Sequence, residues 1–174
     1  MTDFLATALG CALTAALIFV LRPVARSVGL VDVPDARKSH QGPIPLVGGL
    51  AIFASVLAGC LVPGLTGLSI AVPEVLSFVA AGMILVGVGL VDDFVELSPG
   101  SRFLAQALAT LAMVFGAKVV LADLGAMTLS GAPLELGLAA IPFTLFATVG
   151  VINALNMCDG LDGLSGSQAL VSLG

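Results

Sequence analysis

The sequence has no tryptophan and no tyrosine, and only 10% of its 174 residues are charged. An average soluble domain carries about 25% charged residues. This shortage of charge, with 59% hydrophobic residues, excludes both an ordinary soluble globular domain and a disordered chain. The mean hydropathy of +1.17 and the 21 glycines are instead typical of packed membrane helices.

Cysteine and histidine are also scarce. Three cysteines in 174 residues cannot form a disulfide scaffold. Cys11 and Cys60 lie in apolar runs, where we expect them to pack, and Cys158 has no second cysteine at metal-binding spacing. His40 has no second histidine to complete a metal site. The net charge of −5 argues against nucleic acid as a partner.

Uncharged apolar runs recur along the chain. A helix needs about 20 apolar residues to cross the hydrocarbon core of a bilayer. We therefore expect an all-α fold, a polytopic membrane helical bundle with one transmembrane domain over residues 1–174. It would have about five spans and the start of a sixth, at approximately 4–21, 46–63, 75–91, 103–122, 136–156 and 167–174. The last run stops in mid-pattern, so we expect a chain truncated at its C-terminus.

The connecting segments differ in charge. Segment 123–135 has the alternating and Gly-Pro character of a short hairpin or turn. The loops after spans one, three and five hold five of the six basic residues, Arg22, Arg26, Arg37, Lys38 and Arg102. By the positive-inside rule this face is cytoplasmic and the N-terminus lies outside. The same face holds seven of the eleven acidic residues, although the positive-inside rule gives no reason for acidic residues to gather there.

The first motif on this face is VDVPDARKSHQGPIPLVGG, residues 31–49. It gathers Asp35, Arg37, Lys38 and His40 between prolines, which restrict the backbone. Arginine and lysine donate well to phosphate oxygens. The motif is therefore either a phosphate-binding loop or a solvated positive-inside loop.

The second motif, GLVDDFVELSPGSRFLAQ at residues 89–106, places Asp92 and Asp93 at the end of a span. Two carboxylates in mid-membrane would cost roughly 5–7 kcal/mol, so we expect them at the interface. A magnesium ion would relieve their repulsion, because it binds through one or two carboxylates together with waters and substrate phosphates. The alternative is a polar stop at the end of a helix.

The third motif, NALNMCDGLDGLSG at residues 153–166, is the most specific. Its polar residues recur at three-residue intervals, namely Asn153, Asn156, Asp159 and Asp162. Each step drifts by about 60° around a straight helix, whereas the glycine after each aspartate permits the backbone to curl. A calcium loop does not fit, because leucines stand where it needs oxygen ligands.

Carboxylates and phosphate-binding cations at one membrane face suit the transfer of a phosphoryl group from a soluble donor to a lipid acceptor. Phosphoryl transfer depends mainly on positioning and on neutralising negative charge. A Ser-His-Asp or Cys-His arrangement is not needed, and none is evident in the sequence.

The motifs RKSHQGPIPLVGG, VGLVDDFVELSPGSRFLAQ and NALNMCDGLDGL, in this order, resemble the polyprenyl-phosphate N-acetylhexosamine-1-phosphate transferase family over residues 31–166. The resemblance implies a multi-pass enzyme of the bacterial inner membrane with cytoplasmic catalytic loops. It would transfer N-acetylglucosamine 1-phosphate, or a related sugar phosphate, from a UDP-N-acetylhexosamine to undecaprenyl phosphate. The transfer would release UMP, use Mg²⁺ or Mn²⁺, and begin the membrane stage of cell-surface glycan synthesis. The resemblance is also compatible with a homodimer.

The resemblance also implies roles for residues at the matching positions. The catalytic residues would be Asp92, Asp93, Asp159 and Asp162, and three of them would bind the metal, Asp92, Asp93 and Asp159. The substrate-binding residues would be Asp35, Arg37, Lys38, His40, Asn153 and Asn156. Glu96 stands where close relatives often carry aspartate. The family's later Asp-containing metal motif and His-rich loop do not occur before Gly174.

The chemistry of the acceptor favours one mechanism. A phosphate monoester has a second pKa of about 6 and is largely dianionic at neutral pH, so it needs no strong base to attack. We therefore prefer direct attack on the sugar-bearing phosphorus over an aspartyl-phosphate intermediate. Two other functions stay open, an intramembrane Mg-dependent prenyltransferase using Asp92, Asp93 and Glu96, and a transporter or non-catalytic membrane subunit.

Overall fold

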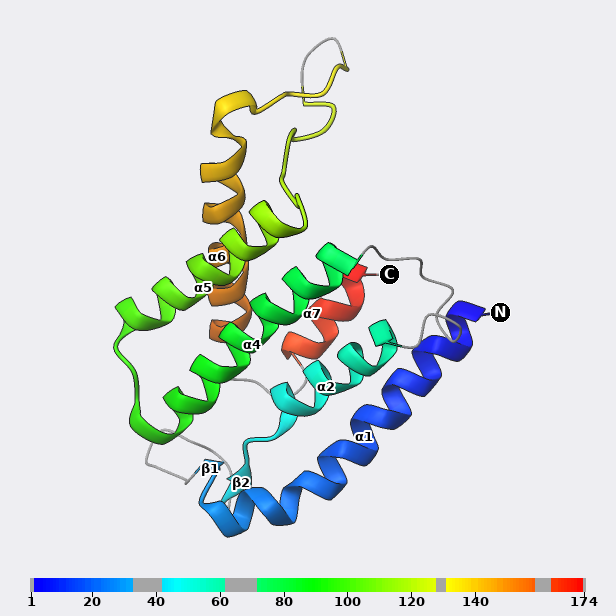
Figure 1. Cartoon of the computed structure of the whole chain (residues 1–174), viewed down its shortest axis with the longest axis vertical. Helices are drawn as coiled ribbons and strands as arrows, with labels where there is room; N and C mark the ends of the chain where they lie inside the picture. The colour runs from blue at the N-terminus through cyan, green and yellow to red at the C-terminus, as the bar shows by residue number, and fades with distance from the viewer. Residues whose placement is uncertain (1, 33–41, 62–71, 128–130, 159–163, 174) are drawn as a thin grey trace.

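The computed structural model describes residues 2–32, 42–61, 72–127, 131–158 and 164–173. Most of these residues are helical (Figure 1). In chain order the elements are α1 (Thr2–Val28), β1 (Val31–Asp32), β2 (Ile44–Pro45), α2 (Gly48–Leu61), α4 (Val72–Val95), α5 (Pro99–Gly116), the 3-10 helix η1 (Gly137–Ala139), α6 (Ala140–Cys158) and α7 (Leu164–Leu173). The expected all-α fold is confirmed.

Three helical segments of the described chain are long and apolar enough to cross a membrane. They are Phe4–Val28, Val72–Val95 and Gly137–Met157, and α2 is a shorter apolar helix. Their large side chains point outward, with Phe4 80% exposed, Phe19 78% and Phe146 76%. Soluble proteins rarely leave so much contiguous apolar surface in water. The chain is therefore a multi-pass membrane protein.

Helix boundaries differ from the expected spans where local chemistry sets the end. Helix α4 continues through Asp92 and Asp93 to Val95, beyond the expected limit of the apolar run at residue 91. Helix α5 begins at Pro99 because Ser98 caps it, its side chain accepting a hydrogen bond from the Ser101 N–H. It ends at Gly116, before the expected limit of 122, and the next charged residue, Lys118, has a left-handed φ of 55°.

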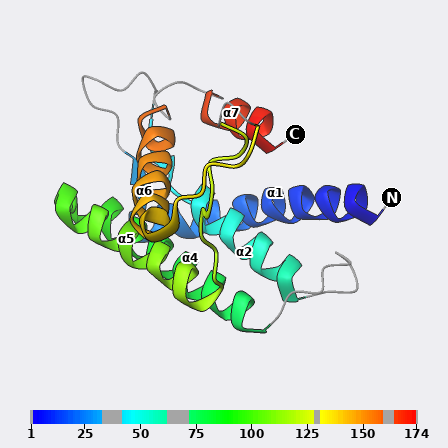
Figure 2. The same ribbon diagram turned by 90° about the horizontal axis from the view of Figure 1, so that it is seen from above.

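The helices form a connected series in which each neighbour packs on the next. Helix α1 packs on α2, α2 on α4, α4 on α5, α5 on α6, and α6 on α7. Both views show α1 beside α2 and α4 beside α5 (Figures 1 and 2). Small residues allow the close approach, with Ala81, Ala105 and Ala109 buried. Helix α4 thus contacts both halves of the described chain.

A two-stranded antiparallel ladder joins α1 to α2, although nothing in the sequence predicted it. Val31 pairs with Pro45 and Asp32 with Ile44. Beside it, Leu30 packs with Ala25 and Val47 in a small buried cluster. Strands of two residues carry no recognisable periodicity, which explains why the pattern of the sequence missed them.

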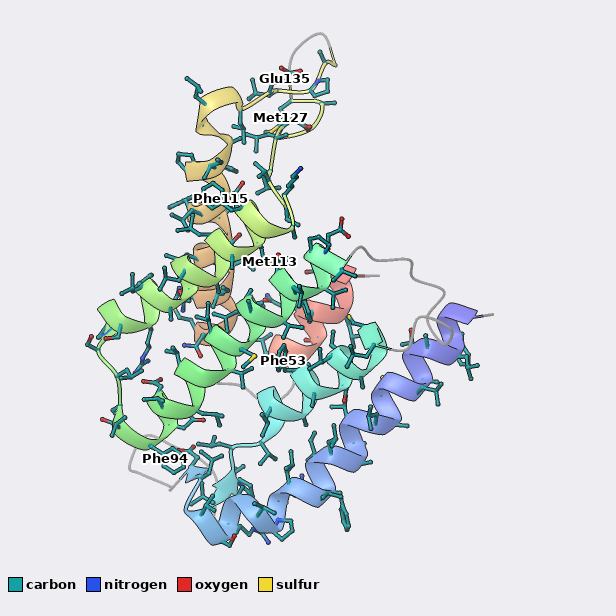
Figure 3. All side chains as sticks on the ribbon, viewed as in Figure 1. Phe53, Phe94, Met113, Phe115, Met127 and Glu135 are labelled. Carbon is teal, nitrogen blue, oxygen red and sulfur yellow. The ribbon has the colours of Figure 1, made fainter. Side chains whose placement is uncertain are left out.

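The expected hairpin or turn at 123–135 is confirmed. Asp123 and Glu135 form an antiparallel bridge, and the Leu124 N–H donates to the Leu134 carbonyl at 3.0 Å. Met127 and Glu135 lie at the upper end of the molecule, whereas β1 and β2 lie at the lower end (Figures 1 and 3). The hairpin and the ladder therefore mark opposite ends of the helices.

The contact between α2 and α4 depends on a glycine. A Cβ atom at Gly82 would overlap the Phe53 ring, which also packs in a tilted arrangement against Phe78, with ring centroids 6.3 Å apart (Figure 3). We expect Gly82→Ala to lower the free energy of unfolding by about 1–3 kcal/mol, the usual cost of overpacking. Thermal unfolding of the purified protein in detergent measures this.

Gly87→Ala is the matched control, because a Cβ there meets nothing within 4 Å. It should leave stability unchanged or slightly raised, since alanine favours helix. Adding Phe53→Leu to Gly82→Ala should recover part of the loss. Equal effects at the two glycines would contradict the role of the ring.

Candidate active site

The described parts of the three motifs meet at one end of the bundle. This is the end where α1 leads into the ladder, α2 begins, α4 turns into α5, and α6 finishes (Figure 1). Two cavities there are lined by residues from different motifs: Asp92 with Asn156, and Asp93 with Leu46 and Gly49. Folding thus brings together Asp92 and Asn156, 64 positions apart, and Leu46 and Asp93, 47 positions apart.

Asp92 and Asp93 line different cavities. Consecutive residues of a helix point about 100° apart, so two adjacent aspartates cannot share one direction. The larger cavity, of about 300 Å³, lies between α4, α5 and α6 and is lined by Leu85, Val88, Gly89, Asp92, Arg102, Ala105, Gln106, Ile152 and Asn156. The smaller, of about 240 Å³, lies between α4 and α2 and includes Asp93 with Leu46, Gly49 and Leu50. Leu85 and Gly89 border both cavities.

Asp92 is held by the turn between α4 and α5. Its Oδ1 accepts a hydrogen bond of 2.7 Å from the Leu97 N–H and lies 2.9 Å from Nε of Arg102. The Glu96 N–H donates to the Asp92 carbonyl, and Glu96 itself has a left-handed φ of 45°. The aspartate therefore ends its own helix and joins that helix to α5 through an ion pair. Its side chain is 23% exposed, which leaves it partly open to the cavity.

Asp93 lies in a field of like charge. Its side chain is exposed, and the negative charges of Asp92 and of Asp32, from the ladder, both act on it. The ladder therefore brings a third carboxylate near the pair. Within the described residues no group of three His, Cys, Asp or Glu side chains is arranged to hold a metal ion.

The third motif contributes two amides with different surroundings. Asn153 donates through Nδ2 to Oε1 of Gln106 at 2.6 Å and to the Val149 carbonyl at 2.7 Å. Asn156, one turn further along α6, is exposed and lines the larger cavity beside Asp92. Asn153 is thus engaged within the protein, whereas Asn156 faces the space that a ligand would occupy.

Six residues expected to act at this site, Asp35, Arg37, Lys38, His40, Asp159 and Asp162, lie outside the described residues. Their roles stay predictions. Sequence reasoning gave no site role to Arg102 or Gln106, which contact Asp92 and Asn153. Their signal was a four-residue spacing on one helix, which places both side chains on one face of α5.

The larger cavity combines groups that suit an anionic ligand with polar substituents. Arg102, which is 42% exposed, brings a positive charge to the cavity wall beside Asp92. Asn156 and Gln106 add amide donors and acceptors, and the remaining wall is apolar. Such an arrangement can orient a phosphorylated ligand at the end of the helices.

Comparison with known proteins gives matches that agree with this chemistry. The sequence model of glycosyl transferase family 4 matches residues 75–174. An undecaprenyl-phosphate alpha-N-acetylglucosaminyl 1-phosphate transferase of Yersinia pestis is 41% identical over 161 residues, covering 91% of this chain and 42% of the relative. The protein of the same name from Escherichia coli K12 is 39% identical over 159 residues with the same coverage.

A probable undecaprenyl-phosphate N-acetylglucosaminyl 1-phosphate transferase of Bacillus subtilis is 33% identical over 155 residues. The match covers 88% of this chain and 41% of the length of that relative. The chain thus spans about two fifths of the length of these relatives. No solved structure matches it.

The left-handed backbone at Glu96 gives a prediction about the turn that holds Asp92. A left-handed backbone costs a non-glycine residue about 1–2 kcal/mol. Glycine avoids this cost, but it loses more backbone entropy on folding, so the net gain in stability is smaller. We expect Glu96→Gly to raise the free energy of unfolding by about 0.5–1 kcal/mol in thermal unfolding. Glu96→Ala, which removes the carboxylate and keeps the strain, should not be stabilising. A gain in the alanine variant would mean that charge, not backbone, is the cause.

Proposed function

Because the chain belongs to glycosyl transferase family 4, we propose that the complete protein is a UDP-sugar:polyprenyl-phosphate sugar-1-phosphate transferase. It moves N-acetylglucosamine 1-phosphate, or a related N-acetylhexosamine 1-phosphate, from the UDP-sugar to undecaprenyl phosphate and releases UMP. The names of the Yersinia and Escherichia relatives support this acceptor and this sugar. The product would be the first lipid-linked intermediate of a cell-surface glycan.

The observation that carries the proposal is the meeting of Asp92, Arg102 and Asn156 around one cavity at the end of apolar helices. A lipid acceptor must keep its chain in the bilayer while its phosphate reaches a water-soluble donor. A site at the end of membrane helices meets both requirements. The charged and amide groups of the cavity match the phosphates and polar substituents of such a donor.

The proposed cofactor is Mg²⁺ or Mn²⁺. The chemistry of the residues fits, because carboxylate oxygens are the ligands that these ions prefer, and Mg²⁺ commonly takes only one or two of them from the protein. Asp92 would contribute a carboxylate from the larger cavity. Contributions from Asp93, which lines the other cavity, and from Asp159 stay predictions. The bound ion would neutralise negative charge on the donor phosphates during transfer.

The chain's own residues would then act by positioning. Asn156 contacts the donor, with Asp162 and the expected substrate-binding residues Asp35, Arg37, Lys38 and His40 completing the site. A phosphate oxygen of the acceptor forms a bond to the sugar-bearing phosphorus as the bond between that phosphorus and the bridging oxygen breaks. The bridging oxygen leaves with UMP. Because the acceptor phosphate is already largely dianionic at neutral pH, no proton has to be removed from the nucleophile.

A covalently phosphorylated aspartate trapped during turnover would contradict this direct route.

Location and orientation form part of the proposal. We place the site at the cytoplasmic face of a bacterial inner membrane, with the N-terminus and the 123–135 hairpin outside. In the full-length protein with its native cysteines replaced, Met127→Cys should react with a membrane-impermeant maleimide in intact cells. Met127 is 70% exposed on the hairpin. Ser101→Cys, at the start of α5, should react only after permeabilisation, and the reverse pattern would contradict the orientation.

Activity is tested with membranes containing the full-length protein, undecaprenyl phosphate, Mg²⁺ and a panel of labelled UDP-sugars. We expect labelled lipid and UMP from UDP-N-acetylglucosamine or a related sugar. Chelation should abolish the product and added Mg²⁺ should restore it. Asp92→Asn and Asp159→Asn should lower the rate by about two orders of magnitude or more, because positioned charge of this kind dominates phosphoryl transfer.

Glu135→Gln is the matched control, since it removes a carboxylate from the hairpin at the opposite end of the molecule. All variants should insert into the membrane in equal amounts. A product that forms from a prenyl diphosphate and not from any UDP-sugar would replace the proposal with prenyl transfer.

A further inference from the structure

We infer that α5 is the positioning element of the proposed site. Arg102 orients Asp92 of α4 and Gln106 orients Asn153 of α6, so that one face of α5 sets the geometry of both neighbouring helices. The inference rests on the proposed function, and it assigns to Arg102 and Gln106 a role that acts through other residues.

The first contact fixes the side chain of Asp92. Nε of Arg102 lies 2.9 Å from Oδ1, and the Leu97 N–H donates to the same oxygen at 2.7 Å. Two partners on one oxygen restrict both side-chain torsions of the aspartate. The side chain of Asp92, which is 23% exposed, also lines the larger cavity.

The second contact fixes the side chain of Asn153. Its Nδ2 donates to Oε1 of Gln106 at 2.6 Å and to the Val149 carbonyl at 2.7 Å. Both N–H bonds of the amide are therefore used within the protein. The Gln106 contact joins α5 to α6 between residues 47 positions apart, at the level of the cavity.

Helix α5 is suited to this role because it is itself anchored. Arg102 and Gln106 stand four residues apart, and hence on one face, while Ala105 and Ala109 are buried between the helices. Ser98 caps the N-terminus one turn before Arg102. Partners of this kind, which hold a catalytic side chain without touching the reacting atoms, typically change activity or metal affinity by about 10- to 100-fold.

The test of Arg102 separates positioning from substrate binding. In the full-length enzyme, Arg102→Met should lower kcat by about 10- to 100-fold while KM for the UDP-sugar stays within about twofold, since the lost interaction is with Asp92. Arg102→Lys, which keeps the charge and loses the planar guanidinium, should fall between wild type and Arg102→Met. Arg22→Met, an equal loss of charge at an exposed position of α1, is the matched control.

The test of Gln106 uses a double-mutant cycle with its partner. Gln106→Leu should lower kcat by about tenfold. Gln106→Glu should retain more activity than Gln106→Leu, because its carboxylate still accepts a hydrogen bond from Asn153 and Arg102 lies one turn away. If Gln106 acts through Asn153, adding Gln106→Leu to Asn153→Ala should cause no further loss. Thermal unfolding of every variant distinguishes mispositioning from a general loss of stability.

Three results would overturn the inference while leaving the proposed function intact: additive losses in the cycle, a raised KM with unchanged kcat in Arg102→Met, or losses that follow thermal stability alone. Failure of the wild-type enzyme to transfer any sugar phosphate would overturn the proposed function, and this inference with it.

Discussion

The ion pair between Asp92 and Arg102 joins the two most extensively packed helices at the end where the motifs meet. A carboxylate at the end of a membrane helix is stabilised by a partner, because the adjacent apolar environment makes an unpaired charge costly. Arg102 and the Leu97 N–H supply that partner within ten residues of the same chain. The turn from α4 to α5 is thereby fixed, and with it the direction in which Asp92 faces its cavity.

The ladder between β1 and β2 acts in the same way on the other side of α4. It holds the start of α2 against the end of α1 and brings Asp32 near enough for its charge to act on Asp93. Two local closures, one before α2 and one after α4, therefore concentrate negative charge at a single end of the bundle. Arg102 balances one of these charges, and among the described residues no three carboxylates are arranged to hold a metal ion.

Much of the fold followed from the sequence, because long apolar runs between polar segments dictate membrane helices. The described parts of the polar motifs lie at one end of the bundle, since polar groups begin where the apolar core of the bilayer ends. The ladder was missed because two-residue strands have no period. The turn after α4 was missed because it is held by a hydrogen bond from the Leu97 N–H to the side chain of Asp92. In the sequence, Arg102 counted only as one of the basic residues that orient the chain, and Gln106 received no role. Their partners on α4 and α6 are far from them in the sequence or become neighbours only through folding.

Gly89 gives the site a property of its own. It borders both cavities, and no neighbouring atom lies within 4 Å of where its side chain would be. Helix α4 is therefore the boundary between the two compartments, and at Gly89 that boundary carries no side chain. A methyl group added there would occupy open space beside the cavities without displacing any neighbouring atom.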